Sequence, residues 1–352
     1  MIGILCSALG LGHYVPGLLI REELASAGVK SCVLVFESFI DKDQRTAIVK
    51  SRAAYQRNSA LVRIGQKLIP KIHASSHINL NEIRCIVDAE RISHFVVLTG
   101  FWLHVLVELA TERSFTTDLL HIDAASSPSW DAGKDAAASL AARNLWISNW
   151  ANRRIEHRID VKCPQIPFVD RRKAVLAHGG GWALGTYKDV TSQIAEAEFD
   201  LHIVLPSNSE RPPWATSVLR IDPQWEAWGT PGEIPTFPPL HEEAFELDEV
   251  AGRRYHDLLE VSRQIRGVVS KPGGATILDC LASATPLIFV EPQGEHEARN
   301  AELWASLGLA ISFDDWARMS FSEDSLYKIH LNLCQARARI PCYVRERLLA
   351  YS

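Results

Sequence analysis

Short apolar runs alternate along the chain with stretches in which apolar residues recur at helical spacing. Residues 2–8 form one such run, residues 13–27 follow a helical pattern, and SCVLVF at 31–36 is a second run. Further strands are expected at IRCIV (83–87), FVVL (95–98) and LLHI (119–122). Strands that alternate with helices predict a parallel, doubly wound sheet.

A second alternating series begins after the proline-containing link CPQIPFVDRRK. Its expected strands are AVLAHGGG (174–181), LHIVL (201–205), SVLRI (217–221), GVVS (267–270), PLIFV (286–290) and LAISF (309–313). The stretch DPQWEAWGTPGEIPTFPPL lacks periodicity and is expected to be a long loop. The pattern therefore predicts two α/β domains with a boundary near residue 169.

Composition narrows the class of protein. A chain of 352 residues is long enough for two cores, and a net charge of -5 argues against a general nucleic-acid binder. The seven cysteines include no CxxC pair, which argues against a disulfide framework or a zinc site and fits a reducing cytoplasm. No apolar run reaches eighteen residues, so no membrane-spanning segment is expected.

One segment, residues 37–77, is basic within this acidic chain. The simplest interpretation is a solvated helix face, and contact with an anionic acceptor or a membrane surface stays open. Its apolar residues could equally pack on the core. The segment's basic residues are Lys42, Arg45, Lys50, Arg52, Arg57, Arg63, Lys67 and Lys71, set against Glu37, Asp41 and Asp43.

A glycine-rich turn follows the expected strand GVVS and reads Lys271-Pro-Gly-Gly-Ala-Thr276 before a helical pattern. Glycines let a ligand approach the backbone, and the free N–H groups of a helix start attract an anion, so a phosphate or diphosphate is the expected guest. Asp279 lies one turn after Thr276, where its carboxylate can accept hydrogen bonds from a ribose. The alternatives are that Thr276 caps the helix and Asp279 faces solvent.

A second loop, QGEHE at 293–297, follows the next expected strand and opens the helical stretch ARNAELWASLG. Two adjacent strand ends then face one crevice, which is where open α/β sheets bind ligands. The whole pattern, with its paired glycines, Thr276, Asp279 and the later Asn300-Ala, resembles the donor-binding segment of UDP-sugar glycosyltransferases of the GT-B fold. It is similar in particular to processive diacylglycerol glucosyltransferases, plant galactolipid synthases and the peptidoglycan N-acetylglucosaminyltransferase.

The resemblance extends to other parts of the chain. Gly10-Leu-Gly12-His13-Tyr-Val-Pro16 is similar to the Gly-x-Gly-His-x-x-Pro of that family. His178-Gly-Gly-Gly-Trp182 resembles the glycine loop that opens its second domain, and HIDAASSPSW places Asp123 where the family has an acidic residue. Three positions depart from the pattern. Asp279 replaces Glu, and the chain reads Ser283-Ala-Thr-Pro286 where the family has Gly-x-Pro. His296-Glu297 stands where Gln-Glu or Asp-Gln meets the hexose hydroxyls, which leaves the hexose open.

The resemblance implies an α/β GT-B fold, with two Rossmann-like parallel-sheet domains facing a cleft. Residues 1–168 are then an acceptor-binding domain, residues 169–335 a nucleotide-sugar-binding domain, and residues 336–352 a helix that packs back on the first domain. The implied activity is inverting transfer of a hexose from a UDP-sugar to a hydroxyl or amine of a small acceptor, expected to be a specialised metabolite. A membrane-surface glycolipid synthase is the alternative, using residues 37–77.

His13 is the expected base because an imidazole pKa of about 6.5 suits neutral pH, and a helix start disfavours its protonated form. Asp123 is expected to steady the imidazolium. Neither a cofactor nor a metal is expected, since backbone N–H groups would stabilise the departing diphosphate and the only Asp-x-Asp motif, Asp41-Lys-Asp43, is distant in the chain. The donor-binding residues are expected to be Gly12, Gly180, Gly181, Ser270, Lys271, Gly273, Gly274, Ala275, Thr276, Asp279, His296 and Glu297.

Other interpretations stay open at this stage. His13 and Asp123 could be capping residues, and Trp182 could serve packing alone. A dinucleotide-dependent oxidoreductase would use Gly10-x-Gly12 and Glu37, although Val15 occupies the third glycine position. A nucleotide-sugar epimerase and a non-catalytic sugar-nucleotide binder are the remaining alternatives.

Overall fold

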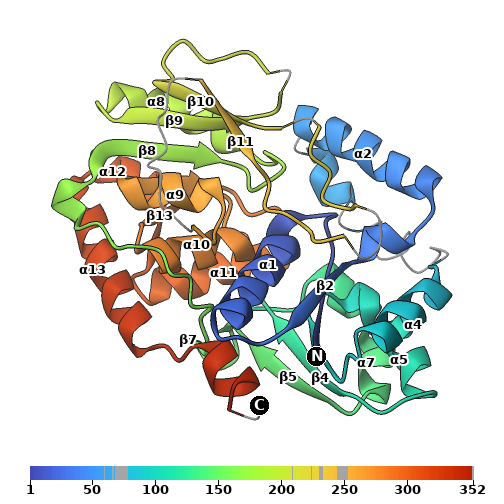
Figure 1. Cartoon of the computed structure of the whole chain (residues 1–352). Helices are drawn as coiled ribbons and strands as arrows, with labels where there is room; N and C mark the ends of the chain where they lie inside the picture. Colours follow the sequence, from blue (N-terminus) through green and yellow to red (C-terminus); the bar gives the residue numbers. More distant parts are fainter. Residues whose placement is uncertain are drawn as a thin grey trace.

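The computed structural model describes residues 1–58, 60–65, 67, 78–207, 209–222, 224–229, 233–243 and 253–350. The first domain contains a five-stranded parallel sheet in the order β2-β1-β3-β4-β5 (Figure 1). Its strands are β1 (Ile2–Cys6), β2 (Ser31–Val35), β3 (His94–Val97), β4 (Thr116–His121) and β5 (Ala142–Trp146). Its helices are α1 (Leu11–Ser26), α2 (Lys42–Arg57), α4 (Leu80–Ala89), α5 (Leu103–Ala110), α6 (Pro128–Ala132) and α7 (Lys134–Ser139), with 3-10 turns at Phe36–Phe39 and Gly100–Trp102.

The second domain contains a seven-stranded sheet in the order β11-β10-β9-β8-β12-β13-β14, in which β11 alone is antiparallel to its neighbour. Its strands are β8 (Arg172–His178), β9 (Asp200–Leu205), β10 (Ser217–Ile221), β11 (Leu240–Glu243), β12 (Ile265–Ser270), β13 (Leu287–Phe289) and β14 (Ala310–Ser312). Its helices are α8 (Thr191–Glu196), α9 (Asp257–Gln264), α10 (Gly274–Ser283), α11 (Glu295–Ser306), α12 (Phe313–Arg318) and α13 (Glu323–Arg339). A short hairpin of β6 (Ser148–Asn149) and β7 (Arg154–Ile155) follows β5, and 3-10 turns lie at Phe168–Asp170 and Tyr187–Val190.

One expected strand is wrong. IRCIV lies within helix α4, where Ile83 and Val87 are buried while Arg84 is half-buried and Asp88 is exposed. Spacing of four between the buried residues is that of a helix face, and a window of five residues could not distinguish it from a strand. The sequence pattern does not reveal the edge strand β5, because ARNLW is a short mixture of polar and apolar residues and none of them is buried.

Helix α1 lies between the two sheets, at the centre of the view in Figure 1, and packs against α10 of the second domain. The proline-rich loop after β10 holds it there. Tyr14 Oη donates to the carbonyl of Thr236 at 2.8 Å, Arg21 Nη1 donates to the carbonyl of Pro235 at 2.7 Å, and Trp225 contacts the Tyr14 ring edge-on. The first domain's helix is therefore fixed by contacts that come from the second domain.

The chain crosses back to the first domain after α13 (Figure 1). A π-helical turn at Val344–Leu348 follows, and Tyr343 Oη donates to the Asp118 carboxylate in β4 at 2.9 Å. Cys342 Sγ donates to Glu23 Oε1 in α1 at 2.7 Å. These buried polar contacts add a second connection between the domains.

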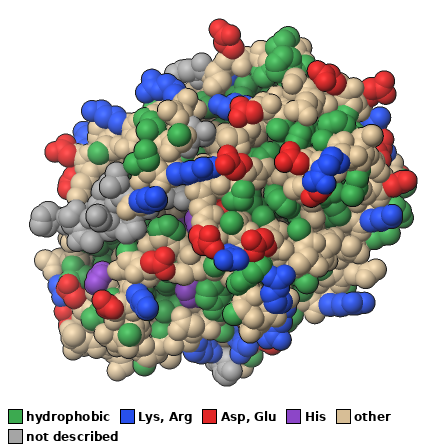
Figure 2. All heavy atoms as spheres, turned by 180° about the vertical axis from the view of Figure 1, so that it is seen from behind, with side chains coloured by type: hydrophobic (Ala, Val, Ile, Leu, Met, Phe, Trp, Pro, Cys, Tyr) green, Lys and Arg blue, Asp and Glu red, His purple; other side chains and the backbone are tan. Residues whose placement is uncertain are grey.

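On the face seen in Figure 2, acidic and basic side chains are interspersed, and neither sign of charge dominates. Of the basic segment at 37–77, the described part comprises 37–58, 60–65 and 67, and residues 59, 66 and 68–77 lie outside the described residues. Within it, α2 begins at the N-cap Asp41, whose carboxylate accepts from the Gln44 N–H. In the described part of the chain, no helix is both long and apolar enough to cross a membrane.

Arg171 anchors the C-terminal end of α10. Its buried guanidinium donates to the carbonyls of Ile166, Ile265 and Ser283 and to Thr285 Oγ1, at 2.7 to 3.3 Å. The domain link, the strand β12 and the turn after α10 are thereby joined through one side chain. Burial lowers the pKa of Arg171 to about 10, so it stays charged at neutral pH.

Replacing Arg171 tests this anchor. Arg171→Gln is expected to lower the free energy of unfolding by about 3 kcal/mol, because it leaves several buried carbonyl groups without a donor. Urea denaturation measures the change. The matched control is Arg318→Gln at an exposed position, expected within about 0.5 kcal/mol of the unchanged protein. Equal effects of the two substitutions would contradict the anchoring role.

Candidate active site

A cavity of about 360 Å³ lies between the two domains and is lined by residues of both. The loops after β1 and β4 contribute from the first domain, and those after β8, β12 and β13 contribute from the second. Carboxyl ends of parallel strands thus face one another across it. Every residue predicted from the sequence as catalytic or donor-binding lines this cavity except Ser270, which is the buried last residue of β12.

The start of helix α10 forms one wall. Gly273 is its N-cap and Gly274 its first residue, so the free N–H groups of the first turn open toward the cavity that Ala275 and Thr276 also line. A Cβ on Gly274 would lie 2.6 Å from Ile122 Cγ2 and 3.0 Å from Asp123 Oδ1. Glycine is required here because the first domain approaches the helix start so closely.

Lys271 is paired with Glu297 across the loop before α10. The other oxygen of Glu297 accepts from the Gln293 N–H at 2.8 Å. Burial alone would raise the pKa of Glu297, but nearby Lys271 and His296 and these hydrogen bonds lower it below its usual range. The carboxylate predicted to meet hexose hydroxyls is therefore ionised and holds the ammonium group of Lys271 beside Gly273.

Asp279 has a partner that the sequence did not reveal. His256 Nδ1 accepts from the Leu259 N–H at 3.3 Å, so its Nε2 carries the proton and donates to Asp279 Oδ1 at 3.0 Å. Both side chains are buried at the cavity wall. Asp279 Oδ1 is thus engaged, which leaves Oδ2 as the oxygen available to a ribose. His256 is the N-cap of α9, and it lies 23 positions from Asp279 in the sequence, so no local pattern predicts the pair.

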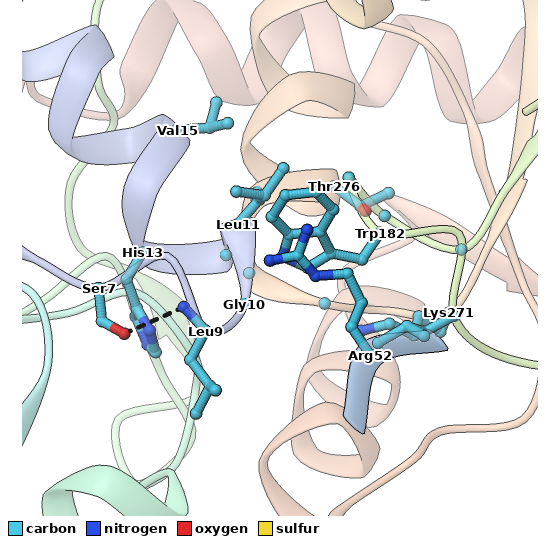
Figure 3. A pocket seen from close by; sticks show the side chains of 18 of the residues that line it. Ser7, Leu9, Gly10, Leu11, His13, Val15, Arg52, Trp182, Lys271 and Thr276 are labelled. Carbon is cyan, nitrogen blue, oxygen red and sulfur yellow. Dashed lines mark hydrogen bonds between the residues drawn. The ribbon is translucent and has the colours of Figure 1, made fainter. Parts of the chain in front are cut away.

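His13 lies in the first turn of α1 and faces the cavity, as Figure 3 shows. Burial lowers its pKa below the usual value, the Asp123 carboxylate opposes that shift, and His296 adds to it. No hydrogen bond joins the described side chains of His13 and Asp123. Their interaction is electrostatic, and because the effect of burial outweighs it, the imidazole is neutral near neutral pH.

Asn300 in α11 holds Asp123 in place. Its Nδ2 donates to Asp123 Oδ1 at 2.7 Å and to the Pro272 carbonyl at 2.8 Å, while its Oδ1 accepts from the Ala124 N–H at 2.7 Å. One fully buried amide therefore connects the end of β4 to the loop before α10. The sequence offered Asn300 only as part of a motif, without this role.

The glycine loop after β8, residues 178–182, forms another wall of the cavity. His178 Nδ1 accepts from the Gly180 N–H at 3.1 Å, and burial with nearby Lys271 and His256 lowers the pKa of His178 to about 3. Gly180 adopts a φ of +71°, and a Cβ on Gly179 would lie 2.1 Å from the Leu184 carbonyl oxygen. A neutral His178 and backbone geometry accessible to glycine thus fix the loop that carries Gly180 and Gly181.

Glu37 does not serve a dinucleotide ribose. Its Oε1 accepts from Ser7 Oγ at 2.5 Å and from the Leu9 N–H at 3.1 Å, and its Oε2 accepts from the Ala8 N–H at 2.8 Å. The side chain is fully buried, and burial raises its pKa despite these bonds. Glu37 holds the loop between β1 and α1 in place. Its carboxylate is therefore not available to bind a ribose, as the oxidoreductase interpretation requires.

Among the described residues, no group of three or more His, Cys, Asp or Glu side chains is placed to hold a metal ion.

Comparison with known proteins identifies the fold. No protein-family model and no curated protein sequence matches the chain. The glycosyltransferase SsfS6 of Streptomyces sp. SF2575, complexed with thymidine diphosphate, aligns with a TM-score of 0.61 at 14% identity, over 100% of this chain and 99% of that chain. The calicheamicin glycosyltransferase CalG4 aligns with a TM-score of 0.56 at 12% identity, over 99% and 97%. The spinosyn rhamnosyltransferase SpnG, complexed with spinosyn aglycone, gives 0.55 at 13% identity, over 98% and 99%.

These matches extend over nearly the whole of each chain, so the predicted GT-B arrangement of two α/β domains is confirmed. At such low identity they establish the fold and leave the chemistry to the residues. None of these three glycosyltransferases is named for lipid or peptidoglycan glycosylation, so the narrower likeness to that group is not supported.

The close approach at Gly274 generates a stability prediction. Gly274→Ala is expected to lower the free energy of unfolding by about 1–3 kcal/mol, because its methyl group meets Ile122 and Asp123. Gly12→Ala is the control, since a Cβ there meets nothing within 4 Å. Thermal denaturation without ligand compares the two. A melting temperature of Gly274→Ala equal to that of the unchanged protein would contradict the proposed tight junction.

Proposed function

We propose that the protein is an inverting glycosyltransferase that moves a hexose from a UDP-sugar to a hydroxyl or amine of a small acceptor, a specialised metabolite. The observation that carries this proposal is the juxtaposition of His13 and Asp123 with the start of α10 across one cavity. A neutral base on one wall and anion-binding N–H groups on the other are what sugar transfer from a diphosphate requires. Similarity to glycosyltransferases named for spinosyn and calicheamicin supports the choice of a small acceptor.

The reaction proceeds in one displacement. The acceptor oxygen attacks the anomeric carbon while His13 takes its proton, and the bond from that carbon to the diphosphate oxygen breaks with its electron pair leaving on the nucleotide. Attack opposite to the leaving group inverts the anomeric configuration. Asp123, held by Asn300, stabilises the imidazolium that forms.

The leaving diphosphate gains its stabilisation from the second domain. The N–H groups at Gly274 and Ala275 and the ammonium of Lys271 face the space where it would lie. This supply of positive charge supports transfer without an added metal. Asp279 Oδ2 is the candidate acceptor for a ribose hydroxyl, which favours a uridine over a 2′-deoxy nucleotide.

A donor screen with product mass tests the function. The expected result is UDP release that depends on a cell extract containing the acceptor, together with a product whose mass is increased by one sugar. The activity is expected to persist when a metal chelator is added. His13→Ala is expected to reduce turnover by about 10²–10⁴-fold while UDP affinity is retained. The matched control is His104→Ala, at an exposed position of α5.

Each of the other possible results would indicate a different function for this protein. Isomerised sugar without acceptor indicates an epimerase, and hydride transfer to a nicotinamide indicates an oxidoreductase. Nucleotide binding without any turnover indicates a binding protein. A preference for thymidine diphosphate sugars, the nucleotide bound in SsfS6, would contradict the assigned role of Asp279 but not glycosyl transfer.

The pH dependence follows from the sign of the His13 shift. Because the base must be neutral and burial lowers its pKa, kcat/KM is expected to fall only below the usual histidine pKa of about 6.5. The Asp123 carboxylate raises the pKa of His13, so Asp123→Asn should move this acid limb to lower pH while reducing the maximal rate. Rates measured from about pH 4 to 9 check it. A limb that moves to higher pH in the variant would contradict the assignment.

A further inference from the structure

Arg52 extends from helix α2 into the cavity without being used by the proposed chemistry. Its guanidinium carbon lies 3.3 Å from the centroid of the Trp182 ring and 5.4 Å from that of Trp228. Figure 3 shows the guanidinium lying over the Trp182 ring. The indole itself is fixed, since Trp182 Nε1 donates to the Ala8 carbonyl at 3.2 Å and Gln56 Nε2 donates to the Trp182 carbonyl at 2.9 Å.

One edge of this guanidinium has no partner. Its Nε and Nη2 are buried from solvent and donate to no group in the described part of the chain. These two nitrogens lie on the same edge, so their N–H groups point in parallel, with the spacing of the two oxygens of a carboxylate. Burial lowers the pKa of Arg52 to about 10, against the effect of Glu37 and Glu226, so the group is cationic at neutral pH.

Neither nearby carboxylate, Glu37 or Glu226, forms a hydrogen bond with this edge in the described part of the chain. Both oxygens of Glu37 accept from the loop after β1. Leaving two buried N–H groups unpaired is unfavourable, and a ligand that supplies acceptors removes that cost. The surrounding cavity wall on the first domain is mostly apolar, being formed by Leu9, Val15, Ile40, Ile48, Val62 and Phe101.

We propose that Arg52 is a specificity-determining residue that binds the two coplanar oxygens of a carboxylate carried by an otherwise apolar acceptor. The inference rests on the proposed function, because it names the acceptor class of the same site. A diphosphate of the donor could offer oxygens to the same edge. Arg52 belongs to α2 of the first domain, however, and the donor's anion already has the start of α10 and Lys271 on the second.

Direct binding tests the proposal without requiring turnover. Affinities of 6-hydroxy-2-naphthoic acid and its methyl ester are measured by calorimetry in the presence of UDP. The unchanged protein is expected to bind the acid about 10- to 100-fold more tightly than the ester, as a desolvated charge-assisted pair predicts. Arg52→Gln is expected to bind both equally, and Arg52→Lys to retain only part of the preference, since it keeps the charge without the paired N–H groups.

The matched control is Lys50→Gln, which removes the same charge from an exposed position of α2 and should keep the full preference. Equal affinity of the unchanged protein for acid and ester would overturn the proposal. So would a loss of UDP affinity in Arg52→Gln measured without either probe, which would assign the edge to the diphosphate. A preference for the acid in a protein that transfers no sugar would support the Arg52 site while contradicting the proposed function.

Discussion

One buried amide, that of Asn300, fixes the two domains against each other at the point where the chemistry is expected. Its nitrogen donates to Asp123 and to the Pro272 carbonyl, and its oxygen accepts from Ala124. Each buried polar group left unpaired would cost about 1–3 kcal/mol, so a displacement of either domain at this junction is opposed by several groups at once. The position of Asp123 beside the glycine turn is therefore set by packing and hydrogen bonding together.

This junction brings two helix starts to one cavity. Helix α10 begins at Gly274 against the end of β4, and α1 begins at Leu11, whose side chain meets the position a Cβ of Gly181 would occupy. Helix N-termini carry partial positive charge, which disfavours a protonated imidazole and favours an anion. Burial between the domains lowers the pKa of His13, and the start of α10 prepares a place for a diphosphate, so both features follow from the close approach of the two domains.

The sequence predicted most of the sheet but not the pairing of its side chains. Buried parallel strands such as β8 and β12 contain short apolar runs, AVLA and GVV, whereas the edge strand β5, of mixed polarity, contains none. The glycine turns were predictable because their chemistry is local. The pairs His256–Asp279 and Asn300–Asp123 join residues 23 and 177 positions apart, so only the tertiary fold brings them together. At Glu37 the local pattern was misleading. Its position after β2 suggested a carboxylate that binds a ribose, whereas in the structure it accepts hydrogen bonds from the β1–α1 loop.

Positive groups offset the carboxylates that line this cavity. Asp123, Asp279 and Glu297 all line it, and three unpaired negative charges would repel a diphosphate. Lys271 neutralises Glu297, whereas Asn300 and His256 orient Asp123 and Asp279 through hydrogen bonds. Positive charge near the cavity comes from the start of α10 with Lys271 on one domain and from Arg52 on the other. Two separate positive groups in a largely apolar cavity fit two negatively charged ligands: a diphosphate bound by the second domain and a carboxylate bound by the first.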